Sequence, residues 1–382
     1  MKYNWGKIRL GDVCLTNINT YSSRDQWDFV NYLDTGNITS NCIDSIQHID
    51  IKTEKLPSRA KRKVNYNNII YSTVRPNQRH YGIIKEQPEN FLVSTGFTVI
   101  EVDPDKVDAD YLYFLLSSDS ITESLSAIAE QSTSAYPSIK PSDIENLEIL
   151  LPTLSEQKQI ACILKALDDK IALNQQINKN LEEQAQAIYK AWFMDFEPFD
   201  GEMPSDWTYR TLGDIATVSS GKRPPMKSDV KTKETHIPIV GASSVMGFTN
   251  EANHRDKILV IGRVGTHGIV QRFNRPCWTS DNTLVLTSQH YEYVYQILRT
   301  IDYASLNRGS TQPLITQSDI KKLEILLPTE SIARDFEGIV EDLMLLHEEN
   351  ILENEKLFNL RDTLLPRLMS GEIDVSKVEI SI

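Results

Sequence analysis

The sequence SDIENLEILLPT, from Ser142 to Thr153, returns almost unchanged as SDIKKLEILLPT, from Ser318 to Thr329. Ten of the twelve positions are identical, at an offset of 176 residues. A match of this density within one chain indicates that one structural unit occurs twice.

A second anchor bounds the repeated unit. Trp5 is followed by Leu10-Gly11-Asp12, and Trp207 is followed at the same spacing by Leu212-Gly213-Asp214. This offset is 202, so the first copy is 26 residues longer between its anchors. The ends of the two copies are therefore alike, whereas their middles differ.

The divergent middles predict mixed α/β domains. Strand-like runs alternate with Gly, Pro and Asn turns, which predicts strands at 91–93, 98–102 and 283–286 and short helices at 110–116 and 291–298. A looser likeness joins residues 69–75 to residues 258–263, and both stretches end in an arginine, Arg75 and Arg263.

Each copy leads into a long stretch of good helix formers. Residues 155 to about 193 contain no Pro or Gly, and Thr153 and Glu156 can form a capping box at the start. The pattern recurs from residue 331 to about 369, where Pro366 is expected to kink or end the last turns.

Apolar residues recur every seven positions in both stretches, which predicts a coiled-coil seam. Two unrelated amphipathic helices, each packed on its own domain, are the alternative. The first helix ends where the second domain begins, so a pair must be antiparallel, with a length of about 58 Å. The predicted seam contains Ile160, Leu167, Leu181 and Ile188 in the first helix and Phe336, Leu343, Leu357 and Leu364 in the second, with a flanking stripe of Ile163, Leu164, Ile171, Ile177, Ile339, Leu346 and Leu360.

Two asparagines interrupt the heptads. Asn174 and Asn350 are again 176 residues apart, and each lies near the middle of its helix. Because the midpoints meet in an antiparallel pair, we hypothesise that these side chains contact each other and fix the register. The alternative places both on a solvated edge of the seam.

The composition argues against several classes of protein. No run of about 18 apolar residues occurs, and the N-terminal MKYNWGKIRLGD lacks an apolar signal core, so we expect a cytoplasmic protein that does not contact a membrane. The four cysteines have no CxxC spacing, which fits a reduced compartment and predicts no metal site. The motifs GxxxxGK[ST], GxGxxG, GxSxG and HExxH and an Asn-Pro-Pro-aromatic tetrapeptide are all missing, so we expect no catalytic residue.

The net charge of −13 hides an uneven distribution. Residues 52–85 hold nine basic and one acidic side chain, and residues 210–280 hold eleven basic and five acidic ones. The stretches that follow the repeats are acidic, with net charges of −5 over 155–206 and −7 over 331–382. Local basic patches can bind a polyanion on an acidic protein, although a solvated loop is the alternative for either patch.

Four stretches carry a family resemblance: LPTLSEQKQIACILKALDDKI (Leu151 to Ile171), AIYKAWFMDFEPF (Ala187 to Phe199), GEMPSDW (Gly201 to Trp207) and LRDTLLPRLMSGEIDV (Leu360 to Val375). Through them the chain resembles, over nearly its whole length, the specificity subunit of Type I restriction–modification systems. The second helix departs from the family pattern, because Thr329-Glu330-Ser331-Ile332 lacks the Glu-Gln pair of the first.

The resemblance implies an α+β fold with a pseudo-twofold internal repeat, in which two long antiparallel coiled-coil helices join two mixed α/β target-recognition domains. On that layout, residues 1–152 form the first recognition domain, 153–200 the first spacer helix, 201–328 the second recognition domain, and 329–382 the second spacer helix and C-terminal tail. Each domain would read one half of a bipartite site on double-stranded DNA, and the helices would set the spacing between the half-sites.

The resemblance also implies partners. The acidic helices would dock modification (methyltransferase) subunits, two for each chain, and a restriction subunit is an optional third component. No cofactor is expected on this chain, because S-adenosylmethionine for adenine methylation and ATP with Mg would be bound by the partners. One alternative is a stand-alone bipartite DNA-binding protein that acts as a decoy or regulator. A third interpretation is a self-contained methyltransferase or nuclease with an unrecognised site.

Candidate DNA contacts come from the basic middles, because Arg can grip a guanine edge and Lys more often holds a phosphate. They are Arg59, Lys61, Arg62, Lys63, Arg75 and Arg79, with Tyr81 nearby, in the first domain, and Lys222, Arg223, Lys227, Arg263, Thr266 and His267 in the second. For any one of them, plain solubility is the alternative. An apolar cluster of Trp192, Phe193 and Phe196 is either a cap on the second domain or a docking patch for a modification subunit.

Overall fold

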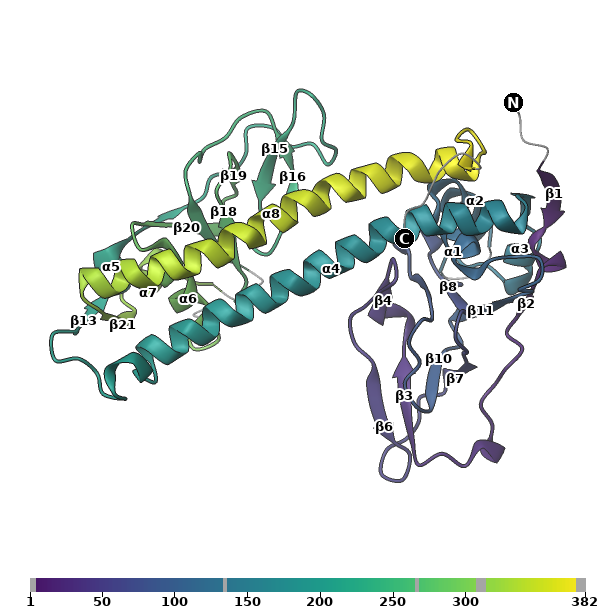
Figure 1. The fold of residues 1–382 in the computed structure, drawn as a ribbon, viewed down its shortest axis with the longest axis horizontal. Coiled ribbons are helices and arrows are strands. Elements are labelled where there is room, and N and C mark those ends of the chain that lie inside the picture. Colours follow the sequence, from purple (N-terminus) through teal and green to yellow (C-terminus); the bar gives the residue numbers. More distant parts are fainter. Residues whose placement is uncertain (1–4, 133–135, 265–267, 307–313, 376–382) are drawn as a thin grey trace. The chain divides into compact units, whose positions relative to one another are not determined.

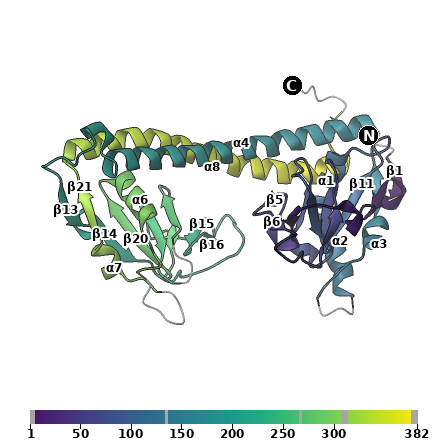
Figure 2. The same ribbon diagram turned by 90° about the horizontal axis from the view of Figure 1, so that it is seen from below.

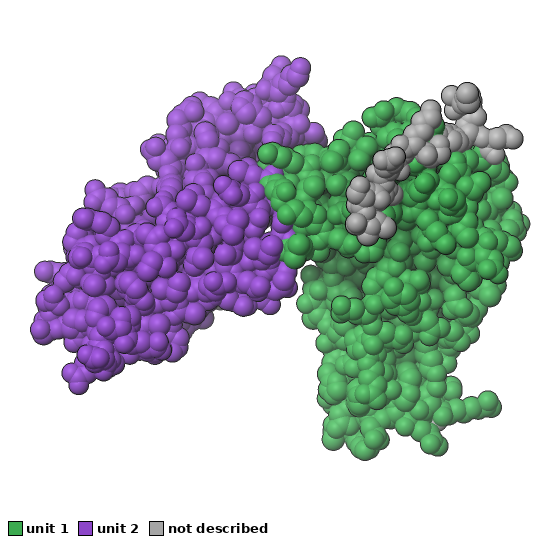
Figure 3. Space-filling view, in the orientation of Figure 1, with its two compact units in different colours: residues 1–173, 353–382 green, residues 174–352 purple. Residues whose placement is uncertain are grey.

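The computed structural model describes residues 5–132, 136–264, 268–306 and 314–375. The chain divides into two compact units: unit 1 is Met1–Leu173 with Glu353–Ile382, and unit 2 is Asn174–Leu352 (Figure 3). The two long helices, α4 (Leu154–Phe193) and α8 (Glu330–Met369), cross this division. Each unit therefore combines one α/β domain with half of each helix, whereas the division by sequence kept domains and helices apart.

In each unit the two sequence anchors lie side by side. Strand β1 (Gly6–Arg9) pairs antiparallel with β12 (Glu148–Leu151) in unit 1, and β13 (Thr208–Thr211) pairs in the same way with β21 (Glu324–Leu327) in unit 2. An equivalent backbone hydrogen bond follows the strand pair in each unit. The Leu10 amide donates to the Leu147 carbonyl at 2.9 Å, and the Leu212 amide donates to the Leu323 carbonyl at 2.8 Å. The repeated sequences thus form the same structural element in both units: the strand pair β1–β12 or β13–β21 with the bond that follows it, here called the mount.

Close packing explains the glycine in each Leu-Gly-Asp anchor. A Cβ atom at Gly11 would lie 3.2 Å from the Cβ of Glu145 at the end of helix α3 (Pro141–Glu145). A Cβ atom at Gly213 would lie 3.1 Å from the carbonyl oxygen of Lys321 at the end of helix α7 (Gln317–Lys321). In each unit the Leu-Gly-Asp sequence packs against a short helix that contains the repeated Ser-Asp-Ile sequence. A residue larger than glycine would push the two segments apart.

The domain of unit 1 contains two four-stranded sheets and a hairpin. One sheet is antiparallel in the order β2-β11-β8-β9, and in the other, β6-β3-β10-β7, strand β10 runs parallel to β3. The strands are β2 Cys14–Thr16, β3 Phe29–Leu33, β4 Ile38–Thr39, β5 Cys42–Ile43, β6 Gln47–Asp50, β7 Ala60–Lys63, β8 Ile69–Ser72, β9 Tyr81–Ile83, β10 Phe91–Ser94 and β11 Phe97–Val102.

The domain of unit 2 repeats this framework in shorter form. Its antiparallel sheet has the order β14-β20-β17-β18, and in its second sheet, β16-β15-β19, strand β19 runs parallel to β15. The strands are β14 Ala216–Ser220, β15 Ile237–Val240, β16 Val245–Thr249, β17 Ile258–Gly262, β18 Val270–Phe273, β19 Trp278–Thr279 and β20 Thr283–Ser288. The duplication therefore extends through the middles, whose sequences barely show it.

One helix in each unit packs against both a sheet and the long helices. Helix α1 (Ala109–Ser117) shares the main core of unit 1 with residues of α4, and α6 (Tyr291–Thr300) shares that of unit 2 with residues of α4 and α8 (Figure 2). The aromatic cluster belongs to this second core, since the Phe193 ring lies 4.7 Å from Tyr293 and 5.6 Å from Trp207. The cluster therefore caps the second domain, and the predicted strands and short helices are confirmed.

Within each unit α4 and α8 lie side by side and run antiparallel (Figure 1). In unit 1, Asp168 accepts a hydrogen bond from Arg361 at 3.0 Å and Lys170 lies 3.1 Å from Glu353. In unit 2, the ring of His347 lies 3.1 Å from the Glu182 carboxylate. Residue numbers rise along one helix as they fall along the other, which confirms the antiparallel pair.

Local signals at the helix ends have mixed outcomes. The capping box is confirmed, because the Thr153 amide donates to the Glu156 carboxylate at 2.8 Å. Helix α8, in contrast, continues through Pro366 to Met369 and does not end there. No helix in the part of the chain that the structure describes is both long and apolar enough to cross a membrane.

The flanking stripe predicted for α8 was wrong. Ile339, Leu346 and Leu360 are 44–46% exposed, whereas Val340 and His347, one residue further along, are buried. The buried seam includes polar residues, which a heptad pattern of apolar residues does not mark.

Candidate nucleic-acid interface

In unit 1 two basic loops are hydrogen-bonded to the same turn. The turn Ser94–Gly96 joins the parallel strand β10 to the central strand β11. The Thr95 amide donates to the Arg59 carbonyl at 2.8 Å, and the Thr73 amide donates to the Gly96 carbonyl at 2.8 Å. The loop before β7, with Arg59, and the loop after β8, with Arg75, are thus held on the same turn.

Arg75 is fixed by its backbone and by an aromatic ring. It has a left-handed conformation (φ 48°), and its amide donates to the Pro137 carbonyl at 2.9 Å. Its guanidinium lies 5.3 Å from the ring centre of Tyr136, which is 60% exposed. Sequence reasoning missed Tyr136, because this contact spans 61 residues and no local pattern marks it.

Two other predicted contacts of the first domain are held by carboxylates. Lys63 forms an ion pair with Asp25 and lies 5.2 Å from the centre of the Trp27 ring. Arg79 lies 2.6 Å from Asp119, and this hydrogen bond raises the pKa of its guanidinium. Both pairs would have to open before these side chains could hold a phosphate.

The remaining predicted contacts of this domain differ in exposure. Arg59 and Lys61 are exposed, whereas Arg62 is half-buried and desolvation lowers the pKa of its guanidinium. Tyr81 is a core residue: it is 4% exposed, its hydroxyl donates to the Ser117 carbonyl at 3.2 Å, and its ring stacks on Tyr71. A side chain buried in this way cannot reach DNA, so Tyr81 has to be removed from the candidate interface.

Unit 2 builds an equivalent centre on the turn Ser280–Asn282, between β19 and β20. The Lys222 amide donates at 2.9 Å to the carbonyl of Thr279, the last residue of β19 before the turn, and the Arg263 amide donates at 2.8 Å to the carbonyl of Asn282 within the turn. The same turn therefore brings the exposed Lys222 and Arg223 close to the half-buried Arg263. A Cβ atom at Gly221 would overlap the Ser280 carbonyl, which explains why the chain has a glycine just before Lys222.

The structure corrects the likeness between Arg75 and Arg263. Thr73 and Arg263 occupy the same backbone position, because each donates to the turn and accepts a bond from a later segment: the Ile139 amide donates to Thr73 at 2.8 Å, and the Ile315 amide donates to Arg263 at 3.0 Å. Arg75 lies two residues further on. The two domains thus share the same pair of backbone hydrogen bonds, but their arginines occupy different positions relative to these bonds.

The other predicted contacts of the second domain are Lys227, Thr266 and His267. In the part of the chain that the structure describes, no hydrogen bond joins them to the turn Ser280–Asn282. Lys227 lies 3.3 Å from Asp229, and both side chains are largely exposed. Thr266 and His267 lie outside the described residues.

Both asparagines that interrupt the heptads lie in a buried polar seam between the helices. Asn350 donates to the side-chain oxygen of Asn178 at 2.8 Å, and Asn178 donates to the His347 carbonyl at 3.1 Å. Asn174 is fully buried in the same unit. Asn350 thus has an asparagine partner, Asn178, that lies one helical turn from Asn174 along α4. Neither Asn174 nor Asn350 lies on a solvated edge.

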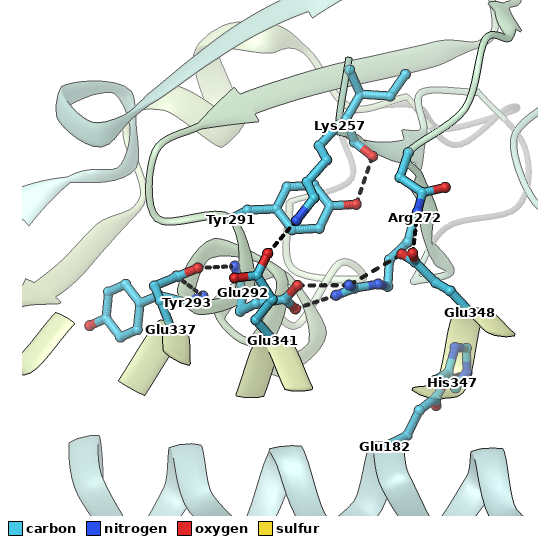
Figure 4. A network of polar contacts seen from close by, with 12 residues as sticks. Glu182, Lys257, Arg272, Tyr291, Glu292, Tyr293, Glu337, Glu341, His347 and Glu348 are labelled. Carbon is cyan, nitrogen blue, oxygen red and sulfur yellow. Dashed lines mark hydrogen bonds and ion pairs between the residues drawn. The ribbon is translucent and has the colours of Figure 1, made fainter. Parts of the chain in front are cut away.

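A buried ionic network connects the domain of unit 2 to α8 (Figure 4). Arg272 of β18 forms two hydrogen bonds with Glu292, one of them at 2.7 Å, and its guanidinium lies 4.9 Å from the Tyr291 ring centre and 4.7 Å from that of Tyr295. The side chains of Arg272 and Glu292 are only 8% and 2% exposed. Glu348 of α8 lies 3.6 Å from Arg272.

Two further residues of α8 join this network. Glu337 accepts from the backbone amides of Glu292 at 3.0 Å and Tyr293 at 2.8 Å, at the start of α6, and burial raises its pKa to about 7. Glu341 lies 2.6 Å from Lys257. The network therefore ties the sheet, α6 and α8 of this unit together.

Comparison with known proteins gives a consistent result. The model of the Type I restriction modification DNA specificity domain matches residues 2–183 and again residues 204–353. The chain is 26% identical to the HindI specificity subunit of Haemophilus influenzae, over 97% of this chain and all of that one. It is 29% identical to the MjaIX specificity subunit of Methanocaldococcus jannaschii, over 85% and 82% of the two chains.

A solved structure shares the fold. The crystal structure of the S subunit of a Type I restriction–modification system from M. genitalium aligns with a TM-score of 0.59, at 18% identity and 96% coverage of both chains. Since the family model matches most of the sequence and does so twice, once in each copy, the chain belongs to the family of Type I restriction–modification DNA specificity subunits.

Proposed function

We propose that each domain of this specificity subunit reads one half of a bipartite site on double-stranded DNA. The observation that carries the proposal is the duplicated turn: Ser94–Gly96 accepts the Thr73 amide and Ser280–Asn282 accepts the Arg263 amide on equivalent sheets, and a second basic loop is bonded at or beside each turn. The frameworks are alike, while the loops differ in length and sequence. Such an arrangement suits two readers that recognise different half-sites.

The helix pair is the proposed spacer. Helices of 40 residues are about 60 Å long at 1.5 Å per residue, which exceeds the length of about one turn of DNA. The polar seam and the interhelical ion pairs favour a single register, so the helices are suited to set the distance between half-sites.

The outer face of α8 is the proposed docking surface for modification subunits, two for each complex. Exposed apolar side chains gather on its first three-quarters, and acidic residues surround them, which suits a protein partner better than DNA. In unit 2 these apolar side chains are Ile339, Leu345, Leu346, Ile351 and Leu352, each 41–46% exposed.

The chemistry is proposed to belong to the partners. Methyl transfer to adenine from S-adenosylmethionine would occur on the modification subunits, and ATP with Mg would serve a restriction subunit. This chain, acting in the cytoplasm, would supply recognition and spacing without a catalytic residue.

Co-expression with a modification subunit of the same organism tests the proposal. We expect the two to co-purify, and sequencing of methylated DNA from those cells to reveal a motif of two half-sites around a gap of fixed length. A stand-alone decoy would bind such DNA without restoring methylation. Binding of S-adenosylmethionine by the isolated chain would instead support a self-contained methyltransferase and contradict the proposal.

A further inference from the structure

We infer that Arg75, whose guanidinium lies over the ring of Tyr136, reads a guanine in the half-site of the first domain. This inference rests on the proposed function, and it names the side chains that determine one base of the specificity. Three features distinguish the pair from the other basic side chains of this domain.

The first feature is availability. Lys63 and Arg79 are each held by a carboxylate, Asp25 and Asp119 respectively. Arg75 instead contacts the neutral ring of Tyr136, which does not neutralise its positive charge. Arg75 is also exposed.

The second feature is a rigid and strained backbone. A left-handed conformation is unusual for a residue with a side chain, and at Arg75 it persists because the segment is bonded on both sides. The Arg75 amide donates to Pro137 at 2.9 Å, and the Val74 amide donates to the Ser72 hydroxyl at 3.2 Å. A side chain presented from a fixed backbone loses less entropy on binding.

The third feature is the aromatic ring beneath the guanidinium, 5.3 Å from ring centre to Cζ. A guanidinium that lies over an aromatic face keeps its N–H donors directed outward in its own plane. A pair of such donors matches the O6 and N7 acceptors of guanine in the major groove. Because Tyr136 is 60% exposed, the ring and the guanidinium are presented to solvent together.

The test uses the complex of the full chain with its modification subunit and reads the methylated motif by sequencing. We expect Arg75→Gln to lower the preference for guanine at one base pair by about tenfold or more, because Gln pairs with adenine rather than guanine. The second half-site should stay unchanged. Tyr136→Phe keeps the ring and should keep the motif, whereas Tyr136→Ala should weaken discrimination at the same base pair.

Arg24→Gln is the matched control, since Arg24 is another exposed arginine of the first domain, and it should leave the motif intact. The inference is overturned if the Arg75→Gln complex assembles and methylates the same motif, with weaker binding to all sequences and a shallower salt dependence, because that behaviour marks a phosphate contact. A wild-type complex that methylates no bipartite motif would overturn the proposed function together with this inference.

Discussion

The carboxylate of Glu337 provides a clear pH dependence in unit 2. Burial raises its pKa from 4.5 to about 7, so the folded chain binds a proton that the unfolded chain releases between these values. The stability contributed by protonated Glu337 is present below about pH 4.5 and is lost as the pH rises through about 7. We expect Glu337→Gln to remove this part of the decline, up to about 3 kcal/mol.

Urea unfolding at pH 5 and pH 7.5 measures the difference, with Glu341→Gln as the control because the Glu341 side chain is 47% exposed in a surface ion pair. An identical decline in wild type and Glu337→Gln would show that this carboxylate does not titrate as stated.

Arg272 is the other residue whose replacement has a sharp expected effect. Arg272→Met leaves Glu292 buried beside a neutral side chain, and breaking a buried pair in this way costs about 3–5 kcal/mol. The double variant Arg272→Met/Glu292→Gln should recover much of that loss, because the most deeply buried charge is removed. Glu348, which is 17% exposed, keeps its hydrogen bond from Asn274. Denaturant unfolding of the three proteins checks this expectation. Equal losses in the single and double variants would contradict it.

Sequence reasoning located the basic loops but not their partners. Charge counts identified the stretches that contain Arg59, Arg75 and Lys222, because like charges cluster locally along the chain. The ring beside Arg75 and the burial of Tyr81 depend on contacts between distant segments, which no local pattern encodes. The match of Arg263 with Thr73 similarly required the sheet register, since a loop of different length hides it in the sequence.

At the level of the helix pair, the contact between Asn178 and Asn350 makes register specificity testable. Asn178→Leu leaves the Asn350 amide buried with its acceptor removed, which should cost about 1–3 kcal/mol. Replacing both asparagines by leucine should restore stability while weakening the preference for one register. Thermal unfolding measures the first effect, and cross-linking of paired cysteines introduced along the exposed edges measures the second. A double variant as unstable as the single one would argue against this role.

The elements divide into those with local signals and those without. The capping box at Thr153 and the heptad spacing of Ile160 and Phe336 are written in neighbouring residues, so they could be predicted. The bond from Asn350 to Asn178 joins side chains of two helices that are 172 residues apart in the sequence, so no local pattern marks it. The persistence of α8 through Pro366 depends on tertiary packing, since Leu368 and Met369 are buried in the core of unit 1.

Across the whole molecule, the same mount occurs twice and carries two different domains, which are the proposed readers of the two half-sites. The repeated SDI..LEILLPT sequence was enough to predict two copies, because the mount makes the same bonds twice. It could not show that the diverged middles share a sheet order, since many different sequences satisfy the same pattern of buried strands. Each reader is therefore expected to keep its own specificity when it is moved to the other mount.

The most direct test exchanges one reader for the other. In the variant, the segment between Leu10 and Leu147 replaces the segment between Leu212 and Leu323, so that the new junctions lie at the two equivalent backbone bonds. Sequencing of the DNA methylated by the complex of this variant with the modification subunit is the measurement. The account predicts a motif in which the first half-site occurs twice and the second is lost. An assembled complex that still methylates the original second half-site would contradict it.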